Sequence, residues 1–231
     1  YDLISSDPTH PLLGSGNLYT QEYFELCKSK LNKDGMVSQY LPLHKLRKED
    51  FLGIIKTFKS VFPNSTVWMG NYHAILVGKN SDSNIDFENF VKNCIQIQDN
   101  YLYTEPYHMA ANLIQNANSI DFICKDAKIN TDDKSYVEFF NLNAFEEDNI
   151  YINLKYLNDN RADISESFTN IPDTALLNKY VNGNTLLNES LYGILSGDMN
   201  SAYNKLLQAI KENPEDKEIP ILLNYYFPHK R

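Results

Sequence analysis

The sequence has few cysteines and no long apolar run. Only 3 of its 231 residues are cysteines, they lie far apart, and none has the Cys-x-x-Cys spacing of a zinc or redox site. We therefore expect Cys27, Cys94 and Cys124 to be buried thiols of a reducing compartment. No apolar run is long enough to cross a bilayer, and no charged-then-apolar leader opens the chain. These absences predict a soluble, cytoplasmic segment.

Basic residues are in the minority and form no long cluster. The 21 Lys and Arg residues against 30 Asp and Glu residues give a formal net charge of −9. Such a surface repels the phosphate backbone of a nucleic acid, so no nucleic-acid partner is expected, whereas a cationic small molecule would be attracted. Apolar residues make up 42% of the chain and aromatic residues 13%, which is enough for one sizeable core and a small second one.

A glycine-rich cofactor loop is also missing after the first predicted strand. Nucleotide-binding α/β folds carry such a loop there, and an acidic ribose ligand follows roughly 20 residues later. Here Gly14 and Gly16 follow an acidic residue, Asp7, and the first predicted strand starts almost at Tyr1. We therefore expect this chain to hold the substrate side of a site, with most of the cofactor side in a missing N-terminal portion.

Alternating strand and helix patterns are present over the first 80 residues. Short apolar runs bounded by turn residues predict strands at 3–6, 36–41, 66–69 and 73–77, the last two as a hairpin. Helical spacing predicts one helix after the N-cap Thr20 and a second from Lys48 to Phe62. The expected fold class is α/β: the C-terminal half of a Rossmann-like sheet of the S-adenosylmethionine methyltransferase type.

After residue 80 the pattern becomes mainly helical. A polar linker at 80–84 precedes a predicted helix over 85–97. The inward-facing residues of that helix are predicted to be Phe87, Phe90, Val91, Cys94 and Ile95. We interpret 1–80 as the second half of the Rossmann-like domain, 81–145 as its helical and extended cap, and 146–231 as a helical C-terminal extension.

One stretch of the extension has the register of a tetratricopeptide repeat. Ala202, Leu206, Ala209 and Pro214 fit the second helix of such a repeat, after a turn at Gly197-Asp198. A stable array needs about three repeats, and only one convincing register is present. The pattern therefore favours a tetratricopeptide-like appendage that packs on its own chain over a peptide-binding groove.

Two motifs, in the same order along the chain, resemble one enzyme family. The first runs Tyr1-Asp2-Leu3-Ile4-Ser5-Ser6-Asp7-Pro8-Thr9-His10-Pro11 and continues with Leu18-Tyr19-Thr20-Gln21-Glu22-Tyr23-Phe24 and a strand end at Gln39. The second is Asn130-Thr131-Asp132-Asp133-Lys134, followed by Glu138-Phe139. Together they resemble the spermidine synthases, the polyamine aminopropyltransferases, and most closely the bacterial variant that is fused to membrane domains.

The resemblance implies transfer of an aminopropyl group from decarboxylated S-adenosylmethionine, a co-substrate, to a polyamine acceptor, with no tightly bound cofactor. It also implies a cationic small-molecule amine as partner, and a homodimer and an upstream membrane domain in the intact protein. A neutral amine attacks the carbon beside the sulfonium, so the site needs a carboxylate that holds the ammonium and accepts its proton. Asp7 matches the family's catalytic Asp. Its alternative role is a turn carboxylate that caps the backbone before Pro8.

Four further residues are predicted to bind substrate. His10 stands where the family usually has a second Asp, and a neutral imidazole does not balance an ammonium as a carboxylate does. It acts either as a base on another nucleophile or as a hydrogen-bonding spacer. Gln39 matches the family's strand-end Gln, against the alternative of a satisfied strand terminus. Tyr19 matches the family's Phe or Tyr, and we interpret it as a wall of the active-site loop. The resemblance places Tyr72 near the pocket tyrosine that the family carries in its last hairpin.

No metal site is predicted. Asp132, Asp133 and Glu138 lack the regular oxygen-ligand spacing of a calcium loop, so we interpret them as a turn followed by a strand. Three histidines lack metal-ligand spacing and are interpreted as structural: His44, His73 and His108. Two other functions stay open, namely a non-catalytic scaffold or sensor, which the His10 replacement favours, and methyl transfer from S-adenosylmethionine.

Overall fold

The computed structural model describes residues 1–8, 15–44, 46–70, 72–81, 84–97, 105–137 and 149–229. The chain forms two compact units, each made of two segments. The first unit comprises Tyr1–Ser83 and Ile114–Ala162, and the second comprises Asn84–Leu113 and Asp163–Arg231. The compact units therefore group residues 84–113 with the C-terminal helices, whereas the division into domains 1–80, 81–145 and 146–231 stays a prediction.

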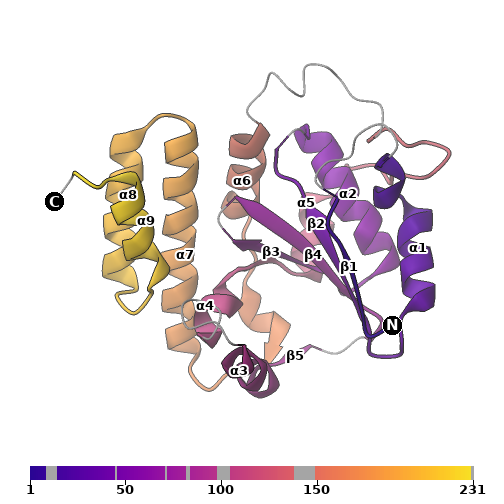
Figure 1. Cartoon of the computed structure of the whole chain (residues 1–231), viewed down its shortest axis with the longest axis horizontal. Coiled ribbons are helices and arrows are strands. Elements are labelled where there is room, and N and C mark those ends of the chain that lie inside the picture. The colour runs from indigo at the N-terminus through magenta and orange to yellow at the C-terminus, as the bar shows by residue number, and fades with distance from the viewer. Residues whose placement is uncertain are drawn as a thin grey trace. The chain divides into compact units, whose positions relative to one another are not determined.

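Among the described residues, the first unit contains a five-stranded mixed sheet (Figure 1). The order of its strands is β1 (Leu3–Ser6), β2 (Met36–Leu41), β4 (His73–Lys79), β3 (Thr66–Gly70) and β6 (Leu113–Gln115). β1 and β2 are parallel, and β4 is antiparallel to both β2 and β3. The strands and the hairpin predicted from the sequence are confirmed, and the architecture fits the expected methyltransferase-like α/β fold.

Helices α1 (Gln21–Lys30) and α2 (Lys48–Val61) lie beside this sheet (Figure 1). The side-chain oxygen of Thr20 accepts a hydrogen bond from the amide of Tyr23 at 3.4 Å, which caps α1 as predicted. The apolar face predicted for the second helix is confirmed. Its fully buried residues are Phe51, Ile54, Ile55, Phe58 and Phe62.

Helix α2 packs directly on β4 because Gly78 has no side chain. A Cβ atom at Gly78 would lie 2.5 Å from Cγ of Phe62 and 2.9 Å from Cε1 of Phe58. These two phenyl rings have centroids 4.9 Å apart, and Phe24 of α1 meets Phe58 edge-on at 5.0 Å. An aromatic cluster between α1, α2 and the sheet therefore forms the core of the first unit.

Two further helices, α5 (Ala117–Ile123) and α6 (Asn149–Asp159), pack against α2. The buried amide of Asn153 in α6 donates hydrogen bonds to the carbonyls of Leu43 and Leu46, at 2.8 and 3.0 Å. These bonds fix the segment that leads from the end of β2 into α2.

The two faces of the sheet differ in exposure. Val37 and Leu76 lie on the face that packs against α2, and both are fully buried. On the opposite face, Leu3, Met36 and Ile75 are 56%, 38% and 39% exposed. Apolar side chains therefore remain in contact with solvent along one face of the sheet, from β1 to β4.

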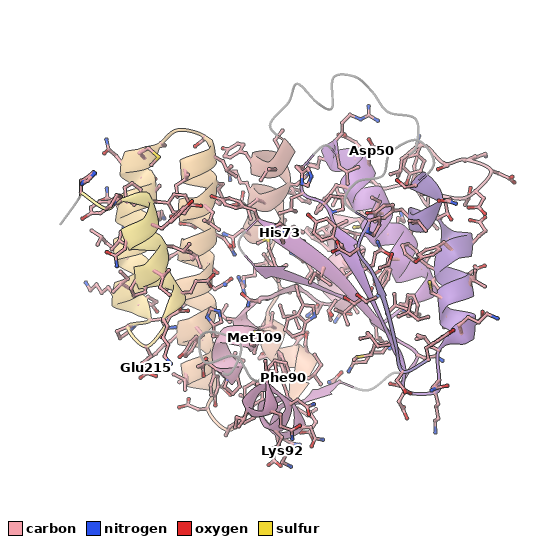
Figure 2. The ribbon with its side chains drawn as sticks, viewed as in Figure 1. Asp50, His73, Phe90, Lys92, Met109 and Glu215 are labelled. Atoms are coloured by element: carbon pink, nitrogen blue, oxygen red, sulfur yellow. The ribbon has the colours of Figure 1, made fainter. Side chains whose placement is uncertain are left out.

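The second unit is mainly helical. Its helices are α3 (Phe87–Gln96), α4 (Pro106–Ala111), α7 (Thr174–Leu195), α8 (Met199–Glu212) and α9 (Glu218–Tyr226). A 3₁₀ helix, η3 (Ile164–Ser167), precedes β7 (Phe168–Thr169), which pairs in parallel with β5 (Ile85–Asp86). The ring of Phe87 contacts those of Phe90, Tyr107 and Phe168, with centroids 6.0, 5.0 and 5.6 Å apart. Figure 2 labels Phe90 on α3 and Met109 on α4.

Helix α3 differs from the prediction at two points. Ile85 and Asp86 belong to β5, and the carboxylate of Asp86 caps α3 by accepting a hydrogen bond from the amide of Asn89 at 3.1 Å. Ile95 is 66% exposed, so its predicted inward orientation is wrong. Each helical residue turns by about 100°, which carries Ile95 away from the stripe that buries Phe87 and Cys94.

Helices α7 and α8 form a closely packed pair. A Cβ atom at Gly193 of α7 would lie 3.2 Å from Cβ of Ala202 in α8. The turn between the helices is at Gly197, with φ of 81°, and Asp198 caps α8 by accepting a hydrogen bond from the amide of Ser201 at 3.0 Å. This is the turn that the sequence predicts, whereas the relation to tetratricopeptide repeats stays a prediction.

Two observations bear on what the sequence lacks. The three cysteines are free and buried, as predicted. Within the described ranges, no helix combines the length and the apolarity that a membrane span requires.

Candidate active site

Asp7 follows the carboxyl end of β1, where that strand runs parallel to β2. The last pair in the register is Ser6 opposite Gln39, so Asp7 comes one residue beyond it, level with Tyr40. Its side chain is exposed. Within the described residues, no hydrogen bond or ion pair involves the Asp7 carboxylate, while the amides of residues 9–14 lie outside them, so the choice between a catalytic and a capping role stays a prediction.

Tyr19 lies beside this carboxylate and is fully buried. It ends the short 3₁₀ helix η1 (Gly16–Tyr19), and its hydroxyl donates a hydrogen bond to the carbonyl of Pro8 at 3.0 Å. Burial raises the pKa of Tyr19, Tyr40 and Asp7 raise it further by their charge, and the Gln39 amide lowers it. The phenol consequently stays protonated and holds the backbone directly after Asp7.

Gln39 points to the buried face of the sheet and is fully buried. Its Nε2 donates a hydrogen bond to the carbonyl of Tyr40 at 3.2 Å. Its Oε1 has no hydrogen-bond partner among the described residues, although it is buried. One polar atom of this buried side chain is therefore without a partner among the described residues, and the place of Gln39 in the amine pocket stays a prediction.

Tyr40 and His73 lie next to the site and were missed by the sequence reasoning. Tyr40 lies on the opposite face from Gln39, because neighbouring residues of a strand point to opposite faces. Its hydroxyl is 3.3 Å from Nδ1 of His73, which is exposed at the start of β4 (Figure 2). Burial raises the pKa of Tyr40, and the charge of Asp7 adds to this effect. The sequence could not place this pair, because the contact depends on the pairing of β2 with β4, which the predicted hairpin of β3 and β4 does not include.

Tyr72 and His10 complete the set of residues predicted from the sequence. Tyr72 is half-buried and directly precedes β4, but its assignment as the pocket tyrosine stays a prediction. His10 lies outside the described residues, and so does the Gly14 loop.

Asn130 connects the second sequence motif to the site. Its buried amide donates to the carbonyl of Tyr19 at 3.2 Å, and its own carbonyl accepts from the amide of Gln21 at 2.9 Å. Its backbone amide donates to the hydroxyl of Thr57 in α2 at 2.8 Å. The motif therefore fixes the position where η1 passes into α1, and Asn130 is a positioning residue that the sequence did not identify.

The rest of this motif forms a turn. Thr131 and Lys134 make an isolated β-bridge, and the amide of Asp132 donates to the carboxylate of Glu22 at 3.0 Å. The predicted strand after the turn does not start before Val137, and Glu138 lies beyond the described residues. In the described part of the chain, no group of three or more His, Cys, Asp or Glu side chains is arranged to hold a metal ion.

A family model matches the N-terminal part of the chain. Residues 1–78 match the family model of the spermine/spermidine synthase domain. No curated protein and no solved structure matches the chain. The matched segment runs from β1 to β4 and includes Asp7, Tyr19, Gln39 and Tyr72, so it supports the resemblance to spermidine synthases that the opening motif indicated.

Proposed function

We propose that this chain supplies the amine side of an aminopropyltransferase site and that Asp7 is its proton acceptor. The observation that carries the proposal is the state of the Asp7 carboxylate. It is exposed, follows the end of a parallel strand, and has no hydrogen-bond or ion-pair partner among the described residues. Ligands of open α/β sheets bind at this edge, and the family match covers the same segment.

The proposed reaction needs one proton transfer, from the ammonium group of the acceptor to the carboxylate of Asp7. The acceptor amine arrives as an ammonium ion, which Asp7 holds by charge. Asp7 takes one proton, and the freed electron pair of the nitrogen attacks the carbon beside the sulfonium of decarboxylated S-adenosylmethionine. The carbon–sulfur bond breaks and its electrons stay on sulfur, which leaves as a neutral thioether. Tyr19 would hold the backbone at Pro8, directly after Asp7, and the Gln39 amide would line the amine pocket.

In this proposal, the part of the site that binds decarboxylated S-adenosylmethionine is formed by strands beyond β1. Among the described strands, β1 is at the edge of the sheet and pairs in parallel with β2. Parallel strands are usually buried on both faces, yet Leu3 of β1 is 56% exposed. Further parallel strands carrying a nucleoside-binding loop would pair with β1 at this edge, next to Asp7, and the helices that connect them would cover the face on which Leu3 is exposed.

We also propose the remaining features that the family resemblance implies. A membrane domain fused to this chain, a cytoplasmic location and a homodimer follow from the resemblance. The tetratricopeptide-like register would make α7 and α8 an appendage on the same chain, and the buried faces of Ala202, Leu206 and Ala209 support such packing.

The test is aminopropyl transfer by the full-length protein, with putrescine, spermidine or cadaverine as acceptor. Asp7→Asn should lower kcat by about 10²–10⁴-fold, because this is the usual contribution of a positioned base. The matched control is Asp2→Asn, the same change at the opposite end of β1, which should keep full activity. Unchanged turnover in Asp7→Asn would show that Asp7 is not the base. Methyl transfer from S-adenosylmethionine would favour a methyltransferase, and no transfer together with a protein partner would favour the scaffold.

A further inference from the structure

We propose that Tyr40, held by His73, is a second amine-binding group beside Asp7. This inference rests on the proposed function and specifies its substrate: the ammonium end of an alkylamine would be bound by one carboxylate and one phenol oxygen. Tyr40 would contact the substrate, and His73 would be a positioning residue that acts through Tyr40.

The register of the sheet brings Asp7 and Tyr40 together. Leu3 lies opposite Met36 and Ser5 lies opposite Ser38, so the odd-numbered residues of β1 share a face with the even-numbered residues of β2. Asp7 and Tyr40 continue this series by one step. Ile75 of β4 lies opposite Tyr40 on the same face and is 39% exposed, so solvent reaches this surface.

The contact with His73 determines which way the Tyr40 hydroxyl points. His73 is the diagonal neighbour of Tyr40 across β2 and β4, a position from which large side chains meet. With the tautomer in which Nδ1 is an acceptor, the hydroxyl donates its only hydrogen to that nitrogen, 3.3 Å away. The oxygen lone pairs are then left as acceptors. An ammonium group, which has only donors, can bind them.

Electrostatics support the same arrangement. The charge of Asp7 contributes to the raised pKa of both Tyr40 and Tyr19, so the carboxylate is near both phenols. Tyr19 uses its hydroxyl hydrogen on a backbone carbonyl and is fully buried. Tyr40 is only half-buried and uses its hydroxyl on an exposed side chain. Of the two phenols, Tyr40 is therefore the one that a ligand can reach.

The pairing of Asp7 with Tyr40 also bears on the position where this sequence has His10 and the family motif has a second Asp. A carboxylate expected beside Asp7 is replaced by His10, which reduces the negative charge available to an amine. A phenol oxygen that accepts a hydrogen bond supplies a neutral second contact. A site with one carboxylate and one phenol suits a single ammonium group, whereas the far end of a long polyamine would need other contacts.

The test measures the binding of propylamine and putrescine to the 231-residue chain by calorimetry. Tyr40→Phe removes the oxygen and keeps the ring, and it should weaken binding about tenfold, as expected for a hydrogen bond to a charged group. His73→Ala should weaken binding to a similar degree, and His73→Gln, whose amide oxygen can accept from the phenol, should restore most of it. The matched control is Tyr1→Phe, an exposed phenol at the other end of β1, which should bind like the unchanged chain.

Each result separates the two proposals. Normal binding in Tyr40→Phe together with lost binding in Asp7→Asn would overturn the role of Tyr40 and keep that of Asp7. Normal binding in Asp7→Asn would overturn both. Equal losses in His73→Ala and His73→Gln would overturn the positioning role of His73. Absence of binding by the unchanged chain would overturn this inference, while transfer by the full-length protein would still decide the proposed function.

Discussion

Asn130 and Tyr19 are 111 positions apart in the sequence and are joined by a buried hydrogen bond of 3.2 Å from the Asn130 amide to the Tyr19 carbonyl. This bond links the two motifs that resemble the spermidine synthases. It holds the end of η1, and the Tyr19 hydroxyl in turn donates a hydrogen bond to the carbonyl of Pro8, directly after Asp7. The second motif is therefore part of the support of the candidate site.

Removal of the Asn130 side chain should destabilise the first unit. Asn130→Ala leaves the Tyr19 carbonyl without its donor in a buried place, which costs about 1–3 kcal/mol. Urea unfolding followed by the fluorescence of Trp68, the single tryptophan of the chain and a residue of β3, would measure this loss. Asp133→Ala, an exposed change in the same turn, should have almost no effect. Equal urea midpoints for the two variants would contradict the stabilising role of the hydrogen bond from Asn130 to Tyr19.

A side chain at position 78 should disturb the contact between α2 and the sheet. In Gly78→Ala the new methyl group would meet the rings of Phe58 and Phe62, and overpacking of this kind costs about 1–3 kcal/mol. Gly70→Ala is the matched control, because a Cβ atom at Gly70 has no neighbour within 4 Å. The fluorescence of Trp68 again reports on this unit. If both variants unfold at the same urea concentration, the packing argument is wrong.

The buried histidine of the second unit should make stability depend on pH. Nδ1 of His108 lies 3.1 Å from a carboxylate oxygen of Asp216, and Nε2 lies 3.4 Å from one of Glu218. Burial by itself lowers the pKa of His108, but Asp216, Glu218 and Glu105 outweigh it, so the pKa is raised. A raised pKa means that the stabilisation is complete below the ordinary value of about 6.5 and is lost as the pH rises through the folded-state value.

We therefore expect the unfolding free energy of the second unit to fall as the pH rises above about 6.5. His108→Gln should remove this slope and lower stability by about 3–5 kcal/mol at pH 6, because it leaves buried carboxylates without their charged partner. Far-UV circular dichroism in urea at several pH values would follow the helices. His229→Gln, an exposed change in the same unit, should keep the slope. A slope that survives in His108→Gln would assign it to another group.

Much of the fold could be predicted because its signals are local. The strands over 3–6 and 36–41 are bounded by turn residues, and the apolar face of α2 repeats with the helical period. The turn at Gly197 is also a local signal. Ile95 shows the limit, because an apolar residue at the margin of a helical stripe is buried only if a neighbour covers it, and Ile95 is 66% exposed.

Some residues of the candidate site could likewise be predicted from local signals, and others could not. The position of Asp7 after the first strand and the place of Gln39 at the end of the second could be read from the order of apolar runs. The pair of Tyr40 with His73 depends on the register between β2 and β4, and a shift of one residue would separate it.

The sequence by itself determined the strands and helices of the first 80 residues, the apolar face of α2, the turn at Gly197 and the place where a carboxylate follows a strand. Only the tertiary structure decided that Asn130 supports Tyr19, that Tyr40 meets His73, and that His108 lies between Asp216 and Glu218. The reason is that periodicity and turn chemistry act between near neighbours in the chain, whereas these contacts join residues 33 to 111 positions apart. Such contacts depend on how all the elements pack together.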